Sequence, residues 1–477
     1  MNQICEHQTV PLSDRTFYFT WVEVTRSGTK MLEVMRQKVS QRWLGKPRAR
    51  GCYTIIRQGL RSHTAESLPP RASKKHEALR QNMTPWTIMQ SLGGGHLLTR
   101  TKRYSVYWDD ATLKRYRSCW LKILGVRRSL TATTSEWERI EDSIGLIANA
   151  QKGNTPVRND FDSIYPWSDI ISYNYDVKGQ RITAYYGDPT FKFDGSNGDV
   201  FTKIPEFYYK RTRDSQYEYI YICRNKLDGY IKSEQFSIAR YTMSGSSSRV
   251  YSRSGYAPLT NVNITNFRTY ARNLGVGFGQ LDWHYFIIQM LYLVEYADYN
   301  SQKKLGPGYT NSSHTGPINS GGCNFLGMKS GSVDGTDNTS MIYRGIEDIY
   351  GNIWQFVDGI NINNYKTYIC YDSDKYAVDT FSGSYKPLSF TNSSVTNSYV
   401  KKLGFDPNHP LVSMATEVGG SSDTYISDNY WCAGEKRIAL VGGAWPDFSR
   451  CGLWCWNLHV TSSYAWTTIG ARLLRNQ

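Results

Sequence analysis

The sequence lacks closely spaced cysteine pairs, a hydrophobic run long enough to cross a membrane and a signal-peptide pattern at its start. Its 477 residues contain nine Cys, an odd number with no Cys-x-x-Cys pair, so we expect no disulfide framework. The most apolar stretch, Phe286–Val294, is far shorter than the ~20 residues that cross a bilayer. The first residues, MNQICEHQTV, lack the basic and then apolar pattern of a signal peptide. These features predict a protein made and kept in a reducing cytoplasm until it is assembled or released.

Catalytic motifs are also missing. The sequence has no Gly-x-Ser-x-Gly, no His-Glu-x-x-His and no glycine-rich phosphate loop. No pairing of a nucleophile with a base stands out. The sequence therefore favours a recognition protein over an enzyme.

Aromatic residues, in contrast, are abundant. They form 14% of the chain, with 36 Tyr and 14 Trp. Tyr and Trp combine a large apolar area with a polar group, so they concentrate in binding surfaces. They also concentrate in β-sheets, and both explanations stay open.

The net charge of +15 belongs to the N-terminal third. Residues 1–135 hold 24 Lys and Arg against 8 Asp and Glu, and the remainder is close to neutral. Such a segment either binds a polyanion or is a solvated tail. Because residues 1–103 mix Pro, Gly and basic residues, we predict a basic, low-order N-terminal arm there, with a short strand in Phe17–Val24 and a helix in Met31–Val39. No clear nucleic-acid or membrane partner is indicated.

Residues 104–235 form a predicted β-rich middle module. In Gln216–Cys223, Tyr219 and Tyr221 alternate with Ile220 and Ile222, which is the period of a strand. Acidic, glycine-rich pieces such as Phe193–Asp199 lack the spacing of a calcium loop and are predicted to be turns.

Residues 236–477 form the predicted third part. Leu281, Phe286, Met290, Leu293 and Ala297 recur at helical spacing and predict an amphipathic helix that packs on a sheet. Loops rich in Gly, Asn, Ser and Tyr follow. The whole chain is thus predicted to be α+β.

Five landmarks in this third part follow the order of a known family. They are FSIARYTMS, LDWHYF, DIYGNIWQFVDG (Asp348–Gly359), RIALVGGAW (Arg437–Trp445) and IGARLL (Ile469–Leu474). This order resembles the C-type-lectin-like fold of the formylglycine-generating, or sulfatase-modifying, type. Within that group the chain resembles the variable proteins of diversity-generating retroelements, in their phage tail-associated branch. Pieces such as Val157–Asp169 extend the resemblance to about residues 135–477.

Several of these landmark residues are predicted to be scaffold. Gly351, Trp354, Gly443, Trp445 and Arg472 should be buried or form turns. Ile469, Ala471 and Leu473 should alternate in a closing strand, with Arg472 on its other side.

The resemblance implies a variable region at about 442–473, with a ligand-binding face in Ala444–Thr468. The predicted ligand-binding residues are Ala444, Pro446, Asp447, Phe448, Arg450, Cys451, Leu453, Trp454, Cys455, Trp456, His459, Val460, Ser462, Tyr464, Trp466 and Thr468. No period of 2 or 3.6 organises this set, and its aromatic members are expected to form one exposed patch.

The resemblance further implies a host-attachment protein of a phage tail. The expected ligand is a protein or glycan receptor on a host cell surface, and the expected partners are other tail components and two further copies in a homotrimer. The expected location is the virion, after synthesis in the bacterial cytoplasm. A variable adhesin displayed on a bacterial surface is the alternative.

A sulfatase-modifying-type oxidase is the remaining alternative. The two copper-binding Cys of those enzymes correspond to about Asp447 and Gly452, and neither is Cys. Cys451, Cys455 and His459 would align as a metal site only on a helix, which Gly452, Trp454 and Trp456 argue against. The Glu-Pro-Asn and Trp-Asn-Asp patterns of calcium-dependent lectins do not occur, and the pairs Asp334/Asp337 and Asp372/Asp374 are predicted turns. We therefore predict no catalytic residue, no metal and no cofactor.

Overall fold

The computed structural model describes residues 122–476 and, before them, five short strands. The chain divides into two compact units, Met1–Lys122 and Ile123–Gln477. The strands of the first unit are β1 (Cys5–Glu6), β2 (Phe17–Thr20), β3 (Arg36–Val39), β4 (Leu97–Thr101) and β5 (Tyr104–Trp108). They form the sheet β1-β2-β3 and the hairpin β4-β5.

The strand predicted within residues 17–24 is confirmed by β2. The helix predicted at residues 31–39 is wrong, because residues 36–39 form the strand β3. Apart from β1 to β4, the low-order arm predicted for residues 1–103 lies outside the described residues.

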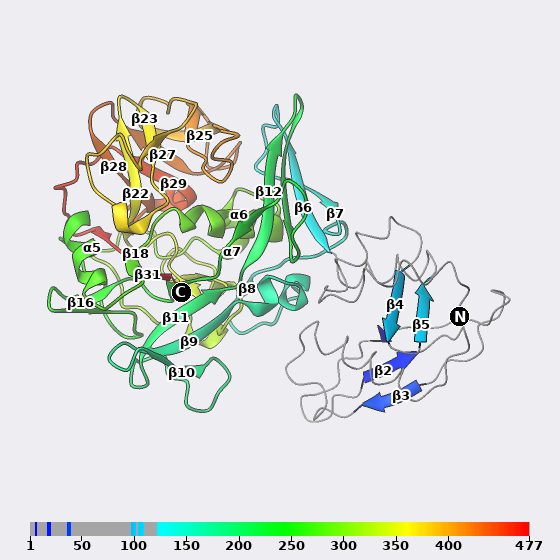
Figure 1. Cartoon of the computed structure of the whole chain (residues 1–477). Helices are drawn as coiled ribbons and strands as arrows, with labels where there is room; N and C mark the ends of the chain where they lie inside the picture. The colour runs from blue at the N-terminus through cyan, green and yellow to red at the C-terminus, as the bar shows by residue number, and fades with distance from the viewer. Residues whose placement is uncertain are drawn as a thin grey trace. The chain divides into compact units, whose positions relative to one another are not determined.

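Strands predominate in the second unit, and most of them belong to three sheets (Figure 1). The six-stranded sheet has the order β10 (Arg181–Tyr185), β9 (Ile171–Asp176), β11 (Asp199–Ile204), β15 (Phe236–Ala239), β31 (Leu473–Asn476) and β18 (Phe278–Gln280). The five-stranded sheet has the order β14 (Ile231–Ser233), β12 (Phe207–Arg213), β13 (Tyr217–Cys223), β6 (Ile123–Ser129) and β7 (Glu138–Glu141).

The third sheet, of nine strands, holds the predicted variable region. Its order is β24 (Lys386–Pro387), β23 (Lys366–Ile369), β22 (Trp354–Asn363), β28 (Arg437–Gly442), β29 (Gly452–Leu458), β27 (Asn429–Cys432), β25 (Val395–Leu403) and β26 (Ala415–Val418), with β30 (Ile469–Gly470) paired to β22. Smaller sheets join β21 (Ile346–Glu347), β20 (Met341–Tyr343), β19 (Gly331–Ser332) and β8 (Gln151–Lys152), and β16 (Ser244–Ser246) with β17 (Arg249–Tyr251).

Three α-helices and five short 3-10 turns complete the second unit. The helices are α5 (Ile264–Arg272), α6 (His284–Tyr296) and α7 (Ser301–Leu305). The 3-10 turns are η4 (Asp160–Ser163), η5 (Trp167–Asp169), η6 (Asn324–Leu326), η7 (Ser373–Lys375) and η8 (Phe448–Arg450). Within residues 122–476 no helix combines the length and apolarity needed to cross a membrane.

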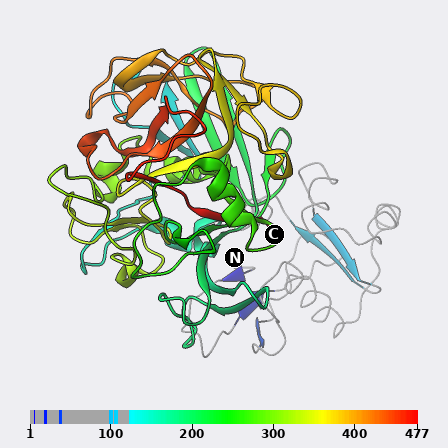
Figure 2. The same ribbon diagram turned by 90° about the vertical axis from the view of Figure 1, so that its left-hand side faces the viewer.

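The predicted middle module and the third part share one sheet. Strand β11 pairs with β15 from Phe201↔Ala239 to Ile204↔Phe236, and β15 pairs in turn with β31. In Figure 2 the red segment runs from the upper sheet down to this pairing. The structure therefore differs from the predicted boundary at 235/236, because hydrogen-bonded neighbours in one sheet belong to one compact unit.

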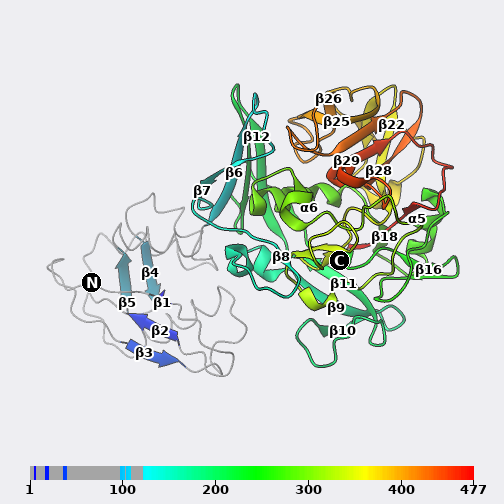
Figure 3. The same cartoon turned by 180° about the vertical axis from the view of Figure 1, so that it is seen from behind.

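Helix α6 is buried on every side. The prediction of a helix here is confirmed, but the prediction that it is amphipathic is wrong. All of His284–Tyr296 is buried, and the left-handed Ala297 (φ 51°) ends the helix. A helix that is apolar all round belongs in the interior. Figures 1 and 3 show α6 between the nine-stranded and five-stranded sheets. Its polar Gln289 is satisfied by the Leu453 carbonyl at 2.6 Å, and its Glu295 by Arg344 at 2.6 Å.

The scaffold predictions are confirmed for most residues. Gly351 (φ 72°) and Gly443 (φ 81°) adopt the left-handed conformation, and Trp354 is buried. Trp445 is half-buried and lies in a turn, which also meets the prediction of burial or a turn. Arg472, expected on the opposite side of a closing strand, is completely buried.

Arg472 joins three parts of the chain through its guanidinium. Its Nε donates to Gln355 Oε1 at 2.8 Å. Its Nη1 donates to the carbonyls of Ala239 and Arg240, and its Nη2 donates to those of Glu347 and Asp348. A buried guanidinium with all these acceptors ties β15, β22 and the segment after β21 together.

The acidic pieces predicted to be turns are confirmed as turns. Asp194 accepts from the backbone N–H of Ser196, and Asp334 accepts from that of Thr336, each at 2.8 Å. Asp372 caps η7 in the same way. Carboxylates used like this hold loops closed.

Candidate ligand-binding surface

The predicted ligand-binding segment, Ala444–Thr468, folds into three consecutive parts. A turn containing η8 comes first, strand β29 follows, and a loop then returns to β30. Because β30 pairs with the start of β22 while β29 pairs with β28, the loop ends back near the point where the segment began.

Strand β29 is a central strand, and both of its faces are covered. It pairs antiparallel with β28 and parallel with β27. The Trp456 ring stacks on Phe286 of α6 at 5.2 Å, and Trp454 meets Tyr299 edge-on at 4.8 Å. The predicted ligand-binding residues that are buried are Ala444, Cys451, Leu453, Trp454, Cys455, Trp456 and Val460.

The expectation that Trp454 and Trp456 belong to an exposed patch is therefore wrong. Both indoles are 1% exposed. The run GLWCWNL alternates large rings at every second position, which is a strand pattern, and its continuous apolar character is typical of a strand buried on both faces. That period of 2 was present in the sequence and was missed.

Polar contacts hold β29 in place. The Trp454 N–H donates to Asp428 Oδ2 at 2.6 Å, and the Leu453 carbonyl accepts from Tyr285 Oη at 3.0 Å. Burial raises the pKa of Asp428 well above its usual range. A Cβ at Gly452 would lie 2.2 Å from Asp428 Oδ1, so only glycine allows this approach. The strand is thus a rigid base for the loops at its two ends.

The other nine predicted residues lie at the surface, exposed or half-buried. They are Pro446, Asp447, Phe448, Arg450, His459, Ser462, Tyr464, Trp466 and Thr468. Three of them are large exposed rings: Phe448 (44%), Tyr464 (40%) and Trp466 (56%). The rings of Tyr464 and Trp466 are stacked with centroids 6.4 Å apart.

The two flanks of β29 converge on the start of β22. On one side, the Trp445 N–H donates to the Asn352 carbonyl at 3.1 Å. On the other side, the Trp354 N–H donates to the Thr468 carbonyl at 2.8 Å. The side chain of Trp354 also hydrogen-bonds Asp447. Residues that are far apart along the segment are therefore brought to one place.

Asp447 has an unusual environment for a surface-loop carboxylate. Burial raises its pKa, although the Ala444 N–H, Arg450 and Trp354 oppose the shift. The Ala444 N–H donates to Asp447 Oδ2 at 2.9 Å. The carboxylate therefore fixes the shape of the turn as well as facing the surface.

A cavity of about 350 Å³ lies under the returning loop. It is lined by Trp354, Arg437, Leu440, Asn457, His459, Val460, Thr461, Tyr464, Thr468 and Ile469. His459, Val460, Tyr464 and Thr468 were predicted from the sequence. We call the nine surface residues and this cavity together the C-terminal surface.

Sequence reasoning missed Trp354, Arg437 and Asn457 as cavity residues. Trp354 was predicted to be scaffold, Asn457 was not among the predicted ligand-binding residues, and Arg437 comes from the edge of a different landmark. Only the pairing of β22, β28 and β29 shows that these residues share one face.

Cys451, Cys455 and His459 do not form a joint site. Cys451 directly precedes strand β29 and Cys455 lies within it, and both are buried. His459 is exposed. Burial raises the pKa of both thiols well above the usual range. Within the described residues, no three His, Cys, Asp or Glu side chains gather closely enough to hold a metal ion.

Comparison with known proteins gives weak similarities. No family model and no curated protein matches the chain. PvdO from Pseudomonas aeruginosa is 12% identical, with 61% of this chain and 99% of that chain covered and a TM-score of 0.28. The Major Tropism Determinant U1 variant is 13% identical, with 83% and 98% covered and a TM-score of 0.25. Scores this low do not establish a shared fold.

Proposed function

We propose that this protein is a receptor-binding protein whose C-terminal surface attaches to a protein or glycan on a host cell. The observation that carries the proposal is the pair of exposed, stacked rings of Tyr464 and Trp466 on a loop beside the cavity. Rings of this kind dominate binding hot spots, and leaving them in water without a partner favours aggregation.

The arrangement of the surface suits recognition with a variable sequence. The rings that must stay, Trp454 and Trp456, pack on Tyr292 and Phe286 of α6. The exposed residues lie in the flanking turn and loop. Loops on a rigid sheet can change their side chains without disturbing the core. Diversification by a retroelement, as the sequence landmarks suggest, would need this separation.

The proposed setting is a phage tail, and the support for it is the order of the sequence landmarks. The tail components and the homotrimer that the resemblance implies stay predictions. A variable adhesin on a bacterial surface would use the same C-terminal surface. A near-identical copy of the final coding stretch beside a reverse transcriptase gene supports diversification.

We propose no oxidase activity. The positions that correspond to the copper-binding cysteines are Asp447 and Gly452. Cys451 and Cys455 are buried, with pKa values raised by burial, so their thiols stay protonated. A protonated thiol is a poor ligand and a poor nucleophile.

The test uses labelled full-length protein and a panel of bacterial strains. Trp466→Ala and Tyr464→Ala should melt like the parent, because both rings are exposed. Binding to the recognised strain should fall roughly thirtyfold for a loss of about 2 kcal/mol. Tyr256→Ala is the matched control, since its ring is 43% exposed and outside the C-terminal surface.

Two results contradict the proposal. One is unchanged cell binding in both variants. The other is a lowered melting temperature that accounts for the whole loss of binding, which would make the rings structural.

A further inference from the structure

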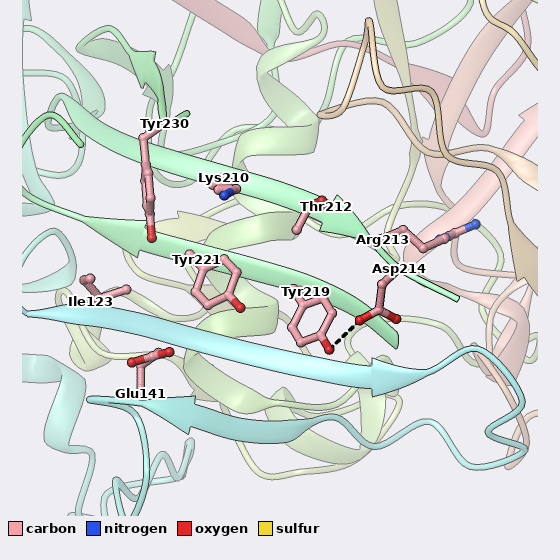
Figure 4. Close-up of a pocket in the computed structure, with 9 residues that line it drawn as sticks. All are labelled: Ile123, Glu141, Lys210, Thr212, Arg213, Asp214, Tyr219, Tyr221 and Tyr230. Carbon is pink, nitrogen blue, oxygen red and sulfur yellow. Dashed lines mark hydrogen bonds between the residues drawn. The ribbon is translucent and has the colours of Figure 1, made fainter. Parts of the chain in front are cut away.

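A second aromatic surface lies on the five-stranded sheet, away from the C-terminal segment. Along β13, Tyr217, Tyr219 and Tyr221 are half-exposed on one face, whereas Glu218 and Ile220 between them are buried. Figure 4 shows Tyr219 and Tyr221 on the open face of this sheet. The alternation places the three rings in a row along one strand.

The rings are ordered relative to one another. Tyr219 and Tyr221 are parallel within 4°, with centroids 6.1 Å apart. Tyr230, from the turn before β14, is tilted by 53° against Tyr221 at 6.5 Å. The first two rings therefore form a floor, and Tyr230 stands as a wall at one end (Figure 4).

Gly125 makes room for this floor. It lies opposite Tyr221 on the neighbouring strand β6. A Cβ at Gly125 would lie 3.0 Å from Tyr221 Cδ1 and 2.9 Å from Ile140 Cγ1. A side chain there would push the tyrosine ring out of its present position.

A cavity of about 350 Å³ opens over these rings. Lys210 and Thr212 of β12 lie on one side of it, and Glu141 of β7 lies on the other. Asp214 lies at the end away from Tyr230, where its Oδ2 accepts from Tyr219 Oη at 2.8 Å. This bond fixes the direction of the Tyr219 ring, so the floor is preorganised.

The charges around the rings balance. Arg127 of β6, the strand next to β13, pairs with Glu138 of β7 at 2.7 Å. Arg211 and Arg213 share the carboxylate of buried Glu218, at 2.5 and 2.6 Å. The charge of Asp214, at the end of the cavity, offsets the second guanidinium. Among the cavity residues, Lys210 and Glu141 then offer one positive and one negative group, and Asp214 is occupied by the hairpin turn. Nucleic acids and other polyanions require a positive excess, which this face lacks.

We propose that this tyrosine face, defined as Tyr217, Tyr219, Tyr221, Tyr230 and the side chains around their cavity, binds an uncharged oligosaccharide. The flat faces of sugar rings carry C–H groups that pack on the negative π-face of an aromatic ring. Sugar hydroxyls donate and accept hydrogen bonds, and the cavity offers the ammonium of Lys210, the hydroxyl of Thr212 and the carboxylate of Glu141. A row of rings suits a chain of sugars.

This binding is separate from the proposed attachment through the C-terminal surface. No residue lines both cavities. A protein with two such surfaces could hold an abundant glycan with one and a specific receptor with the other. Two weak contacts on one molecule bind more tightly than either alone.

Isothermal titration calorimetry on the full chain tests the proposal. The probes are hexasaccharides of glucose, N-acetylglucosamine, mannose and galactose, with an oligothymidylate as the polyanion. We expect at least one hexasaccharide to bind and the oligothymidylate not to. Tyr219→Ala and Tyr221→Ala should each weaken that binding about tenfold or more.

Matched variants separate stacking from other effects. Tyr219→Phe keeps the ring and loses only the bond to Asp214, so it should retain most of the affinity. Trp466→Ala, on the C-terminal surface, should leave the hexasaccharide affinity unchanged even where it abolishes cell binding. The two proposals can therefore fail independently.

Four outcomes overturn the inference. They are no binding of any hexasaccharide at about 1 mM, equal affinity in Tyr219→Ala and the parent, preferential binding of the oligothymidylate, and self-association of the chain that Tyr221→Ala abolishes. The third would show a nucleic-acid surface, and the fourth would show that a second copy covers the tyrosines.

Discussion

The indole of Trp456 stacks on the ring of Phe286, with centroids 5.2 Å apart and 23° between the planes. Trp456 lies in the middle of the segment predicted to bind ligand, and Phe286 lies in the buried helix α6. This contact joins the nine-stranded sheet to the centre of the unit. It shows that the middle of the segment is structural, which leaves its two flanks for the proposed recognition.

Replacing either buried indole in the middle of the segment should therefore destabilise the fold. Trp454→Ala and Trp456→Ala should each lower the free energy of unfolding by about 3–5 kcal/mol, because each leaves a large cavity in a packed core. Urea denaturation followed by circular dichroism measures this. Trp466→Ala is the control, since its ring is 56% exposed and its loss should change stability by less than about 0.5 kcal/mol. Equal losses for Trp456 and Trp466 would contradict the assignment.

Arg472 should be irreplaceable even by lysine. Lysine keeps the charge but cannot supply the planar fork that reaches Gln355 and the four backbone carbonyls. We expect Arg472→Lys to cost about 3–5 kcal/mol, because buried polar groups lose their partners. Arg475→Lys, in strand β31 just after Arg472, is the matched control. Its guanidinium lies over the Tyr175 ring, and the change should cost under about 1 kcal/mol. The interpretation fails if both variants unfold at the same urea concentration.

Two glycines allow the cost of a left-handed backbone to be measured apart from the cost of a steric clash at Cβ. Gly443 (φ 81°) and Gly383 (φ 66°) both have left-handed backbones. A Cβ at Gly443 would lie 2.4 Å from Cys451 Sγ, whereas at Gly383 it would meet nothing within 4 Å. Gly383→Ala should cost about 1–2 kcal/mol from the backbone alone. Gly443→Ala should cost about 1–3 kcal/mol more, because the Cβ overpacks the site. Thermal melting of the two variants measures the difference. Identical melting temperatures would show that the Cβ at Gly443 causes no steric clash.

The carboxyl of Asp348 should make stability depend on pH. Burial, with a contribution from neighbouring Glu347, raises its pKa from 3.8 to about 7. The folded state therefore binds more protons than the unfolded chain between about pH 4 and 7, and this group's contribution to stability falls as the pH rises through that window.

Asp348→Asn isolates this effect, because Asn tolerates the left-handed backbone at this position (φ 50°) and can accept from the Met341 N–H. Urea denaturation at several pH values should show a stability loss between pH 4 and 7 that is smaller in the variant than in the parent. Parallel curves for the two proteins would contradict the raised pKa.

The sequence predicted the parts of the fold that follow from local pattern. The strand of Gln216–Cys223, the turns at Asp194 and Asp334 and the left-handed Gly351 and Gly443 all depend on a few neighbouring residues. The helix at residues 284–296 was located correctly, but its surroundings were not. Its spacing satisfies an amphipathic pattern, and only the sheets packed on both sides show that every face is buried.

The candidate site was predicted only at its edges. Exposure of Phe448, Tyr464 and Trp466 agrees with the prediction. Trp454 and Trp456 were misplaced because their period of 2 was not recognised. The participation of Trp354, Arg437 and Asn457 depends on the pairing of β22 with β28 and of β28 with β29, which a pattern within one segment does not give. The tyrosine face similarly needed the positions of Gly125 and Tyr230, which alternation within one strand does not give.

The place of β31 between β15 and β18 has a consequence for synthesis. Phe236 pairs with Asn476 and Ile238 with Leu474, so β15 is translated long before its partner exists. At about 5–20 residues per second, the ribosome needs roughly 10–50 s to cover this interval. Throughout that time the nascent chain carries a sheet edge without its neighbour, and such an edge is prone to pair with other chains. Production of this protein should therefore depend on chaperones that shield the growing chain.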